Sequence, residues 1–106
     1  MATSYYSDVV LLVQFSRKIE SRTFVEYNSL KLALNGICQL YEQAIKENDP
    51  SVQRITYNMN DLFLYIDNMQ KMTIMLFHPD TWTYKPHDKK WIKHKLVEHI
   101  KDQIGH

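Results

Sequence analysis

The chain has 106 residues, of which 44% are hydrophobic and 24% are charged, with a formal net charge of +1. This length fits one domain, and the near-zero charge excludes a polycation that coats nucleic acid with its whole surface. Cys38 is the only cysteine, so no disulfide can form within the chain, which fits a reducing compartment.

Residues 1–7 are polar and are predicted to be a disordered N-terminus, followed by a single domain over residues 8–104. The apolar run Val9–Val13 is too short for a signal-peptide core or a membrane span, so we expect a soluble intracellular protein with no membrane partner. Asp8–Phe15 is rich in β-branched and aliphatic residues without a helical period, which predicts a strand. Both of its faces are mostly apolar, so we expect both to be covered.

Arg22–Tyr27 alternates in polarity and is predicted to form a hairpin with the first strand. Asn28 or Ser29 is expected to cap a long helix that ends before Pro50. Gly36 lies inside this helix at a cost of about 1 kcal/mol relative to alanine. We interpret it as a point where another backbone approaches closely.

A connector over Val52–Tyr57 precedes a second helix, for which Asn58 or Asn60 is the predicted cap. Met72–His78 then reads as a third strand, and a turn at Pro79-Asp80 leads back.

The return strand is predicted over Thr81–Lys85, with Pro86 ending it. Asp88 is the expected cap of a third helix, which has Trp91 and Ile92 on its apolar side.

The element order strand-strand-helix-helix-strand-strand-helix predicts an α+β fold, with a four-stranded antiparallel sheet and three helices on one face. The other sheet face is then uncovered although it carries apolar residues, and such a face marks an interface. Two copies that pack sheet to sheet as a homodimer would cover both faces. The residues assigned to this interface are Val10, Leu12, Gln14, Thr73, Met75 and Phe77.

Gln14 is the polar member of this set and needs hydrogen-bond partners if it is covered. It can bond its copy, the opposite backbone or water, or alternatively it ends the strand at solvent.

Several blocks of the chain together resemble the enhancer of rudimentary homolog family, over residues 8–96. The blocks stand in the family's order with nearly its spacing. They are LLVQ from Leu11, SRTF.EY.S from Ser21, GICQLYE from Gly36, ITY from Ile55, LF.YID from Leu62 and DT.TY.P..K.WIK.K from Asp80.

The resemblance implies a small α+β homodimer without enzymatic activity. Family members are adaptors in nuclear RNA metabolism and gene expression that hold short segments of RNA-processing or transcription proteins. The chain departs from the family in three places, the first of which is the tail after Leu96. It keeps the family's serine at Ser29 but has Leu32 at the position where the family has an acidic residue. It also has Trp82 where a small polar residue or Gln is usual.

Thr23 has Glu26 three residues later, which fits an acidic-directed kinase pattern, and the resemblance points to phosphorylation here. Alternatively it is an ordinary strand threonine.

Phe15, Tyr27 and Trp82 are candidates for a peptide groove, with core or hairpin packing as the alternative.

The segment Lys85–Lys95 is basic and contains aromatic residues, a combination typical of nucleic-acid contact. Lys89, Lys90 and Lys93 are the candidate RNA contacts, and a solvated helix face is the alternative.

No histidine or cysteine pattern indicates catalysis, a metal or a cofactor. We therefore expect an adaptor, with direct RNA binding as the second hypothesis and a small-molecule enzyme as the least favoured. The expected location is the nucleus, with a cytoplasmic pool as an addition.

Overall fold

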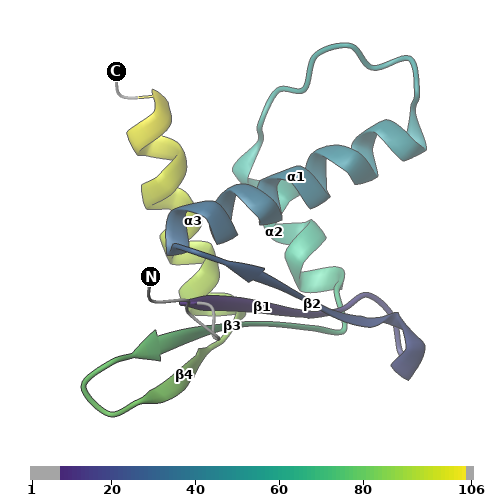
Figure 1. Cartoon of the computed structure of the whole chain (residues 1–106). Coiled ribbons are helices and arrows are strands. Elements are labelled where there is room, and N and C mark those ends of the chain that lie inside the picture. Colours follow the sequence, from purple (N-terminus) through teal and green to yellow (C-terminus); the bar gives the residue numbers. More distant parts are fainter. Residues whose placement is uncertain (1–7, 105–106) are drawn as a thin grey trace, which may run out of the picture.

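The computed structural model describes residues 8–104, and the predicted disordered segment 1–7 lies outside them. Four strands, three α-helices and one short 3-10 helix follow one another along the chain (Figure 1). Their bounds are β1 (Val9–Gln14), η1 (Ile19–Ser21), β2 (Arg22–Tyr27), α1 (Leu30–Asn48), α2 (Met59–Asn68), β3 (Lys71–His78), β4 (Thr83–His87) and α3 (Lys89–Ile104). The predicted α+β class and element order are confirmed.

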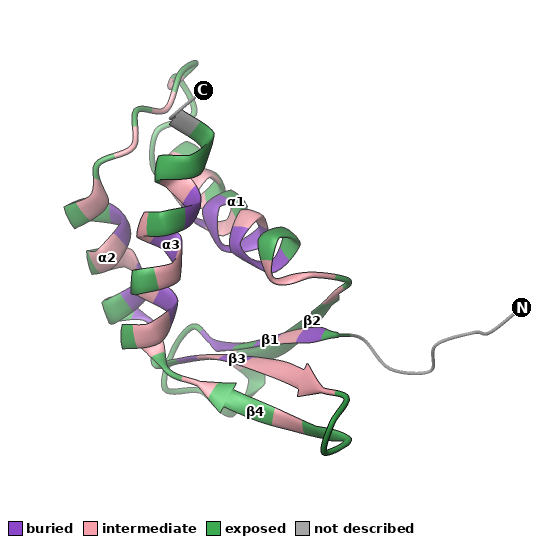
Figure 2. Cartoon of the chain, turned by 90° about the vertical axis from the view of Figure 1, so that its left-hand side faces the viewer, coloured by how far each residue is buried: buried purple, intermediate pink, exposed green. Residues whose placement is uncertain are grey.

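The strands form one antiparallel sheet in the order β2-β1-β3-β4. All three helices lie on one side of this sheet, and the opposite side has no helix (Figures 1 and 2). Both central strands, β1 and β3, send alternate side chains into the layer between sheet and helices. The core there includes the fully buried Leu11, Ile74 and Ile37.

Each α-helix begins at a side-chain cap that the sequence predicted. Ser29 Oγ accepts from the Leu32 amide at 3.2 Å, Asn58 Oδ1 from the Asn60 amide at 2.9 Å, and Asp88 Oδ1 from the Trp91 amide at 3.0 Å. These bonds satisfy amides that the first helical turn leaves without a partner. Since the caps fix where the helices start, they also fix how the helices meet the sheet.

The prediction that Pro86 ends the last strand is wrong. Strand β4 runs from Thr83 to His87, and Pro86 pairs with Met75 of β3. Proline is tolerated because β4 is an edge strand with a neighbour on one side only. Thr81 and Trp82, predicted to open the strand, belong to the turn instead.

The expectation for Gly36 is also corrected. The group that approaches it is the side chain of Tyr27, at the end of β2, and not another backbone. Among residues 8–104, no helix is both long enough and apolar enough to cross a membrane.

Candidate interaction surface on the helix-free sheet face

The strand register defines which residues share the side of the sheet without helices, because directly paired residues point to the same side. Leu12 pairs with Phe24 on β2 and with Thr73 on β3. We call this side the helix-free face. Its members are Val10, Leu12, Gln14, Arg22, Phe24, Glu26, Lys71, Thr73, Met75, Phe77, Tyr84 and Pro86.

All six residues of the predicted dimer interface lie on this face. The alternation along β1 is sharp, since Leu11 is fully buried while its neighbour Leu12 is 40% exposed. Phe24, opposite Leu12, is 64% exposed. The face thus presents large apolar side chains to solvent in a single chain, and its pairing with a second copy stays a prediction.

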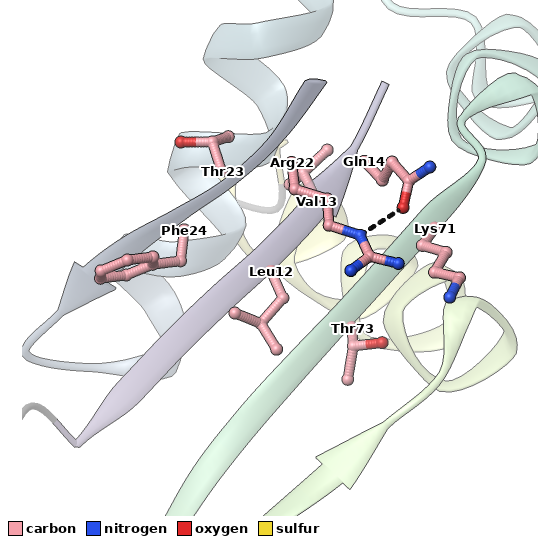
Figure 3. A pocket seen from close by; sticks show the side chains of 8 residues that line it. All are labelled: Leu12, Val13, Gln14, Arg22, Thr23, Phe24, Lys71 and Thr73. Atoms are coloured by element: carbon pink, nitrogen blue, oxygen red, sulfur yellow. Dashed lines mark hydrogen bonds between the residues drawn. The ribbon is translucent and has the colours of Figure 1, made fainter. Parts of the chain in front are cut away.

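A hollow of about 380 Å³ lies at one end of the helix-free face (Figure 3). Apolar Leu12 and Phe24 form part of its wall, and the cationic side chains of Arg22 and Lys71 lie at its polar end. The remaining lining residues are Val13, Gln14, Thr23 and Thr73. The hollow therefore combines apolar contact area with positive charge.

Gln14 is held by its own chain at this polar end. Arg22 Nε donates to Gln14 Oε1 at 2.7 Å, and Gln14 Nε2 donates to the Ser16 carbonyl at 2.7 Å. Gln14 is only 5% exposed, so the alternative that it ends the strand at solvent is wrong. Sequence reasoning missed Arg22, although a hairpin that pairs the two strand ends brings these residues together.

An aromatic cluster occupies the opposite end of the helix-free face, beside the β3–β4 turn. The Phe77 ring lies edge-on to Trp82, with 5.7 Å between centroids, and to Tyr84, with 5.3 Å. Phe77 and Tyr84 are directly paired strand residues, whereas Trp82 belongs to the turn. The apolar surface therefore extends past the strands.

The three predicted groove residues are not brought together. Tyr27 pairs with Val9 at the start of β1, whereas Phe15 follows the end of that strand. Phe15 lines a separate hollow between α1 and α2 with Leu40 and Tyr65. Trp82 lies in the turn that joins β3 to the edge strand β4. Phe15, Tyr27 and Trp82 therefore lie in three separate places and do not form one groove.

Most of the predicted RNA-contacting lysines have partners within the chain. Lys89 Nζ donates to the Met69 carbonyl at 2.5 Å, and Lys93 Nζ forms an ion pair with Asp67 at 2.5 Å. Lys90 is exposed on the same helix. Two of the three ammonium groups therefore tie α3 to the end of α2.

A polar cluster joins α1 to α3 away from the helix-free face, and sequence reasoning did not find it. His99 Nε2 lies 2.6 Å from Asn35 Oδ1, and Gln103 Nε2 donates to the same oxygen at 3.2 Å. Burial, followed by the nearby Lys31, lowers the pKa of His99, and Asp102 opposes this. A neutral imidazole that donates from Nε2 fits this geometry.

Cys38 lies next to this cluster on α1 and is buried. Burial raises the pKa of the Cys38 thiol, and a contact with the Tyr57 hydroxyl opposes the rise. The neutral thiol is the less nucleophilic form. Within residues 8–104, no three side chains of the metal-binding types gather closely enough to hold an ion.

Comparison with known proteins identifies relatives that span nearly the whole chain. A sequence model described as enhancer of rudimentary matches residues 5–106. A protein named enhancer of rudimentary homolog from Echinococcus multilocularis is 39% identical over 100 residues, which is 93% of this chain and 98% of that relative. One from Arabidopsis thaliana is 37% identical over 92 residues, with 87% and 84% covered. Protein enhancer of rudimentary from Drosophila virilis is 36% identical over 90 residues, with 85% and 86% covered.

Proposed function

The chain belongs to the enhancer of rudimentary family, and on that premise we propose that it is a non-enzymatic homodimeric adaptor. In this proposal it binds short segments of RNA-processing or transcription proteins and acts in nuclear RNA metabolism and gene expression. No cofactor takes part. Residence in the nucleus depends on these partners, because a chain of 12.7 kDa is small enough to pass nuclear pores unaided.

One observation supports the proposed homodimer: the helix-free face exposes apolar side chains along the centre of the sheet. Leu12 lies in the central strand β1, between the exposed Phe24 and the half-buried Thr73. Sheets with such faces commonly pack against each other, with their inner side chains interdigitated. A two-fold axis through this face would remove the same apolar surface from water in both copies.

Replacement of Leu12 by arginine tests the homodimer. A guanidinium at the centre of the packed sheets would be buried without a counter-charge, so the variant should sediment as a monomer. Leu64→Arg is the matched control, because Leu64 is an exposed leucine of α2 on the helix side of the sheet. Leu64→Arg should remain dimeric. A Leu12→Arg chain that stays dimeric while it is folded would show that another surface pairs.

The adaptor role is tested by affinity purification from nuclear extract followed by mass spectrometry. RNase treatment before elution separates direct protein partners from those linked by RNA. We expect RNA-processing or transcription proteins that survive RNase and that bind through short segments reproducible as peptides. Recovery of no protein partner would contradict the proposal.

Direct RNA binding through the Lys85–Lys95 surface is the alternative function, and it has less support. Lys93 pairs with the Asp67 carboxylate and Lys89 donates to the Met69 carbonyl, which leaves fewer ammonium groups for phosphates. A phosphate-binding surface would show an affinity that falls steeply with salt. Filter binding with single-stranded RNA over a salt series, with Lys90→Glu as the variant, measures this. Retention at physiological salt that Lys90→Glu abolishes would favour the alternative.

A further inference from the structure

The turn between β3 and β4 holds a bulky residue in an unfavourable backbone conformation. The Thr81 amide donates to the His78 carbonyl at 3.3 Å, which closes a β-turn with Pro79 in its second position. Trp82 follows with a φ of 55°, and it is the only residue other than glycine with a positive φ between residues 8 and 104. Hairpin loops that need a left-handed residue before the return strand usually place glycine or asparagine there. A tryptophan in this conformation is a genuine outlier.

The indole of Trp82 gains only part of its possible burial within the chain. It is 73% exposed, although its ring contacts Phe77 edge-on. Large apolar side chains that stay this exposed on a folded chain are typical of interaction sites when they adjoin other apolar surface. Phe77 is a member of the helix-free face, so Trp82 continues that face beyond the end of the strands. Both views show the turn at the end of the β3–β4 hairpin, apart from the three helices (Figures 1 and 2).

We propose that Trp82 is an anchor of the homodimer, and that its exposed indole packs against the second copy of this chain. This inference rests on the proposed function, because it requires the dimer formed by the helix-free face. Continuity favours the second copy as the occupant, because the indole contacts Phe77, a residue of that face. Strained backbone at an exposed residue is typical of functional positions, and tryptophan is enriched among residues that dominate binding. Burial of the indole against the second copy would offset the unfavourable backbone conformation that Trp82 has in the isolated chain.

Two substitutions of Trp82 separate the ring from the backbone strain. Trp82→Ala removes the indole and keeps a side chain that disfavours the left-handed conformation. Trp82→Asn removes the indole and supplies a residue that adopts this conformation more readily. Because both variants lose the anchor, sedimentation should show a dimer dissociation constant raised at least about tenfold in each. In a monomeric Leu12→Arg background, Trp82→Asn should unfold at a higher urea concentration than Trp82→Ala.

Fluorescence gives a direct measure of indole burial. The chain contains two tryptophans, so a Trp91→Phe variant reports Trp82 alone. Its emission should shift to shorter wavelength and resist acrylamide quenching as concentration drives dimer formation. The same variant with Leu12→Arg should stay red-shifted and quenchable at every concentration.

The outcomes distinguish the anchor from the dimer itself. A wild-type chain that is monomeric at high concentration overturns both the anchor and the proposed homodimer. If Leu12→Arg separates the copies while both Trp82 variants keep a dissociation constant within about twofold of wild type, only the anchor is overturned. In that case the exposed indole serves a different partner.

Discussion

The ring of Tyr27 lies against Gly36, and a Cβ placed on Gly36 would come within 2.6 Å of Tyr27 Cζ. Tyr27 is the last residue of β2, and Gly36 lies in the second turn of α1. The absence of a side chain at residue 36 lets the hydroxyl end of the Tyr27 ring lie directly against the helix. This contact joins the edge strand of the sheet to the helix layer.

Gly36→Ala should therefore destabilise the chain although alanine is the better helix former. The helix would gain about 1 kcal/mol from the substitution, but the displaced tyrosine should produce a net loss of about 1–3 kcal/mol in the free energy of unfolding. Urea denaturation measures this. In a Tyr27→Ala background the same substitution should be neutral or stabilising. Equal losses in both backgrounds would show that Tyr27 is not the cause.

Much of the fold could be predicted because its signals are local. In any strand, successive side chains point to opposite faces, which separates Leu11 from Leu12, and the caps Ser29 and Asp88 act within three residues of themselves. Pro86 shows where local reasoning fails. Whether a proline ends a strand depends on how many neighbours the strand has, and that is a property of the whole sheet.

The contacts of the candidate surface were less predictable because they join distant residues. The Gln14–Arg22 bond depends on the register of a hairpin, and the His99–Asn35 bond joins residues 64 positions apart. The left-handed conformation of Trp82 is set by the geometry of its turn. The six residues of the helix-free face on β1 and β3 that the sequence assigns to the dimer interface follow from alternation alone, since one correct face determines the rest of each strand.

Arg22→Ala should destabilise the chain through Gln14. The substitution removes the donor to Oε1 of Gln14, a residue that is only 5% exposed. Loss of one such bond costs about 1 kcal/mol in the free energy of unfolding, which urea denaturation resolves. Arg17→Ala is the control, because Arg17 is an exposed residue of the neighbouring loop. Equal effects of the two substitutions would indicate a general charge effect.

Phosphorylation of Thr23 should leave the homodimer intact. Thr23 borders the hollow, but it pairs with Val13, whose side chain is buried toward the helices, so a phosphate on its hydroxyl would project away from the Leu12 side. It would add about −1.5 to −2 charges to an exposed edge strand and alter partner binding there. Mass spectrometry of the cellular protein tests the modification, and sedimentation of Thr23→Glu tests its effect. A monomeric Thr23→Glu chain would place Thr23 in the interface.

Stability should fall as the pH drops below about 6.5, the ordinary pKa of histidine. Burial is the main cause of the lowered pKa of His99 and of His87. Below 6.5 the unfolded chain binds protons that the folded chain does not, so the free energy of unfolding decreases until the folded-state pKa values are passed. Well above pH 7 these two histidines are neutral in both the folded and the unfolded chain, so they do not make the free energy of unfolding depend on pH. His99→Gln should reduce the slope in urea melts between pH 7 and 5, with exposed His94→Gln as the control.

Cys38 should react slowly with thiol reagents in the folded chain. Its side chain is buried and burial raises the pKa of the thiol, so little thiolate is both formed and accessible near neutral pH. Modification should then require opening of the contact between α1 and Tyr57, whose hydroxyl donates to Glu42. A chromogenic disulfide reagent measures the rate, and urea-unfolded chain supplies the fully accessible reference. Tyr57→Ala should accelerate the reaction by loosening this contact, whereas Tyr84→Ala, on the helix-free face, should leave the rate unchanged. A wild-type rate equal to that of the unfolded chain would show that the thiol is accessible in the native state.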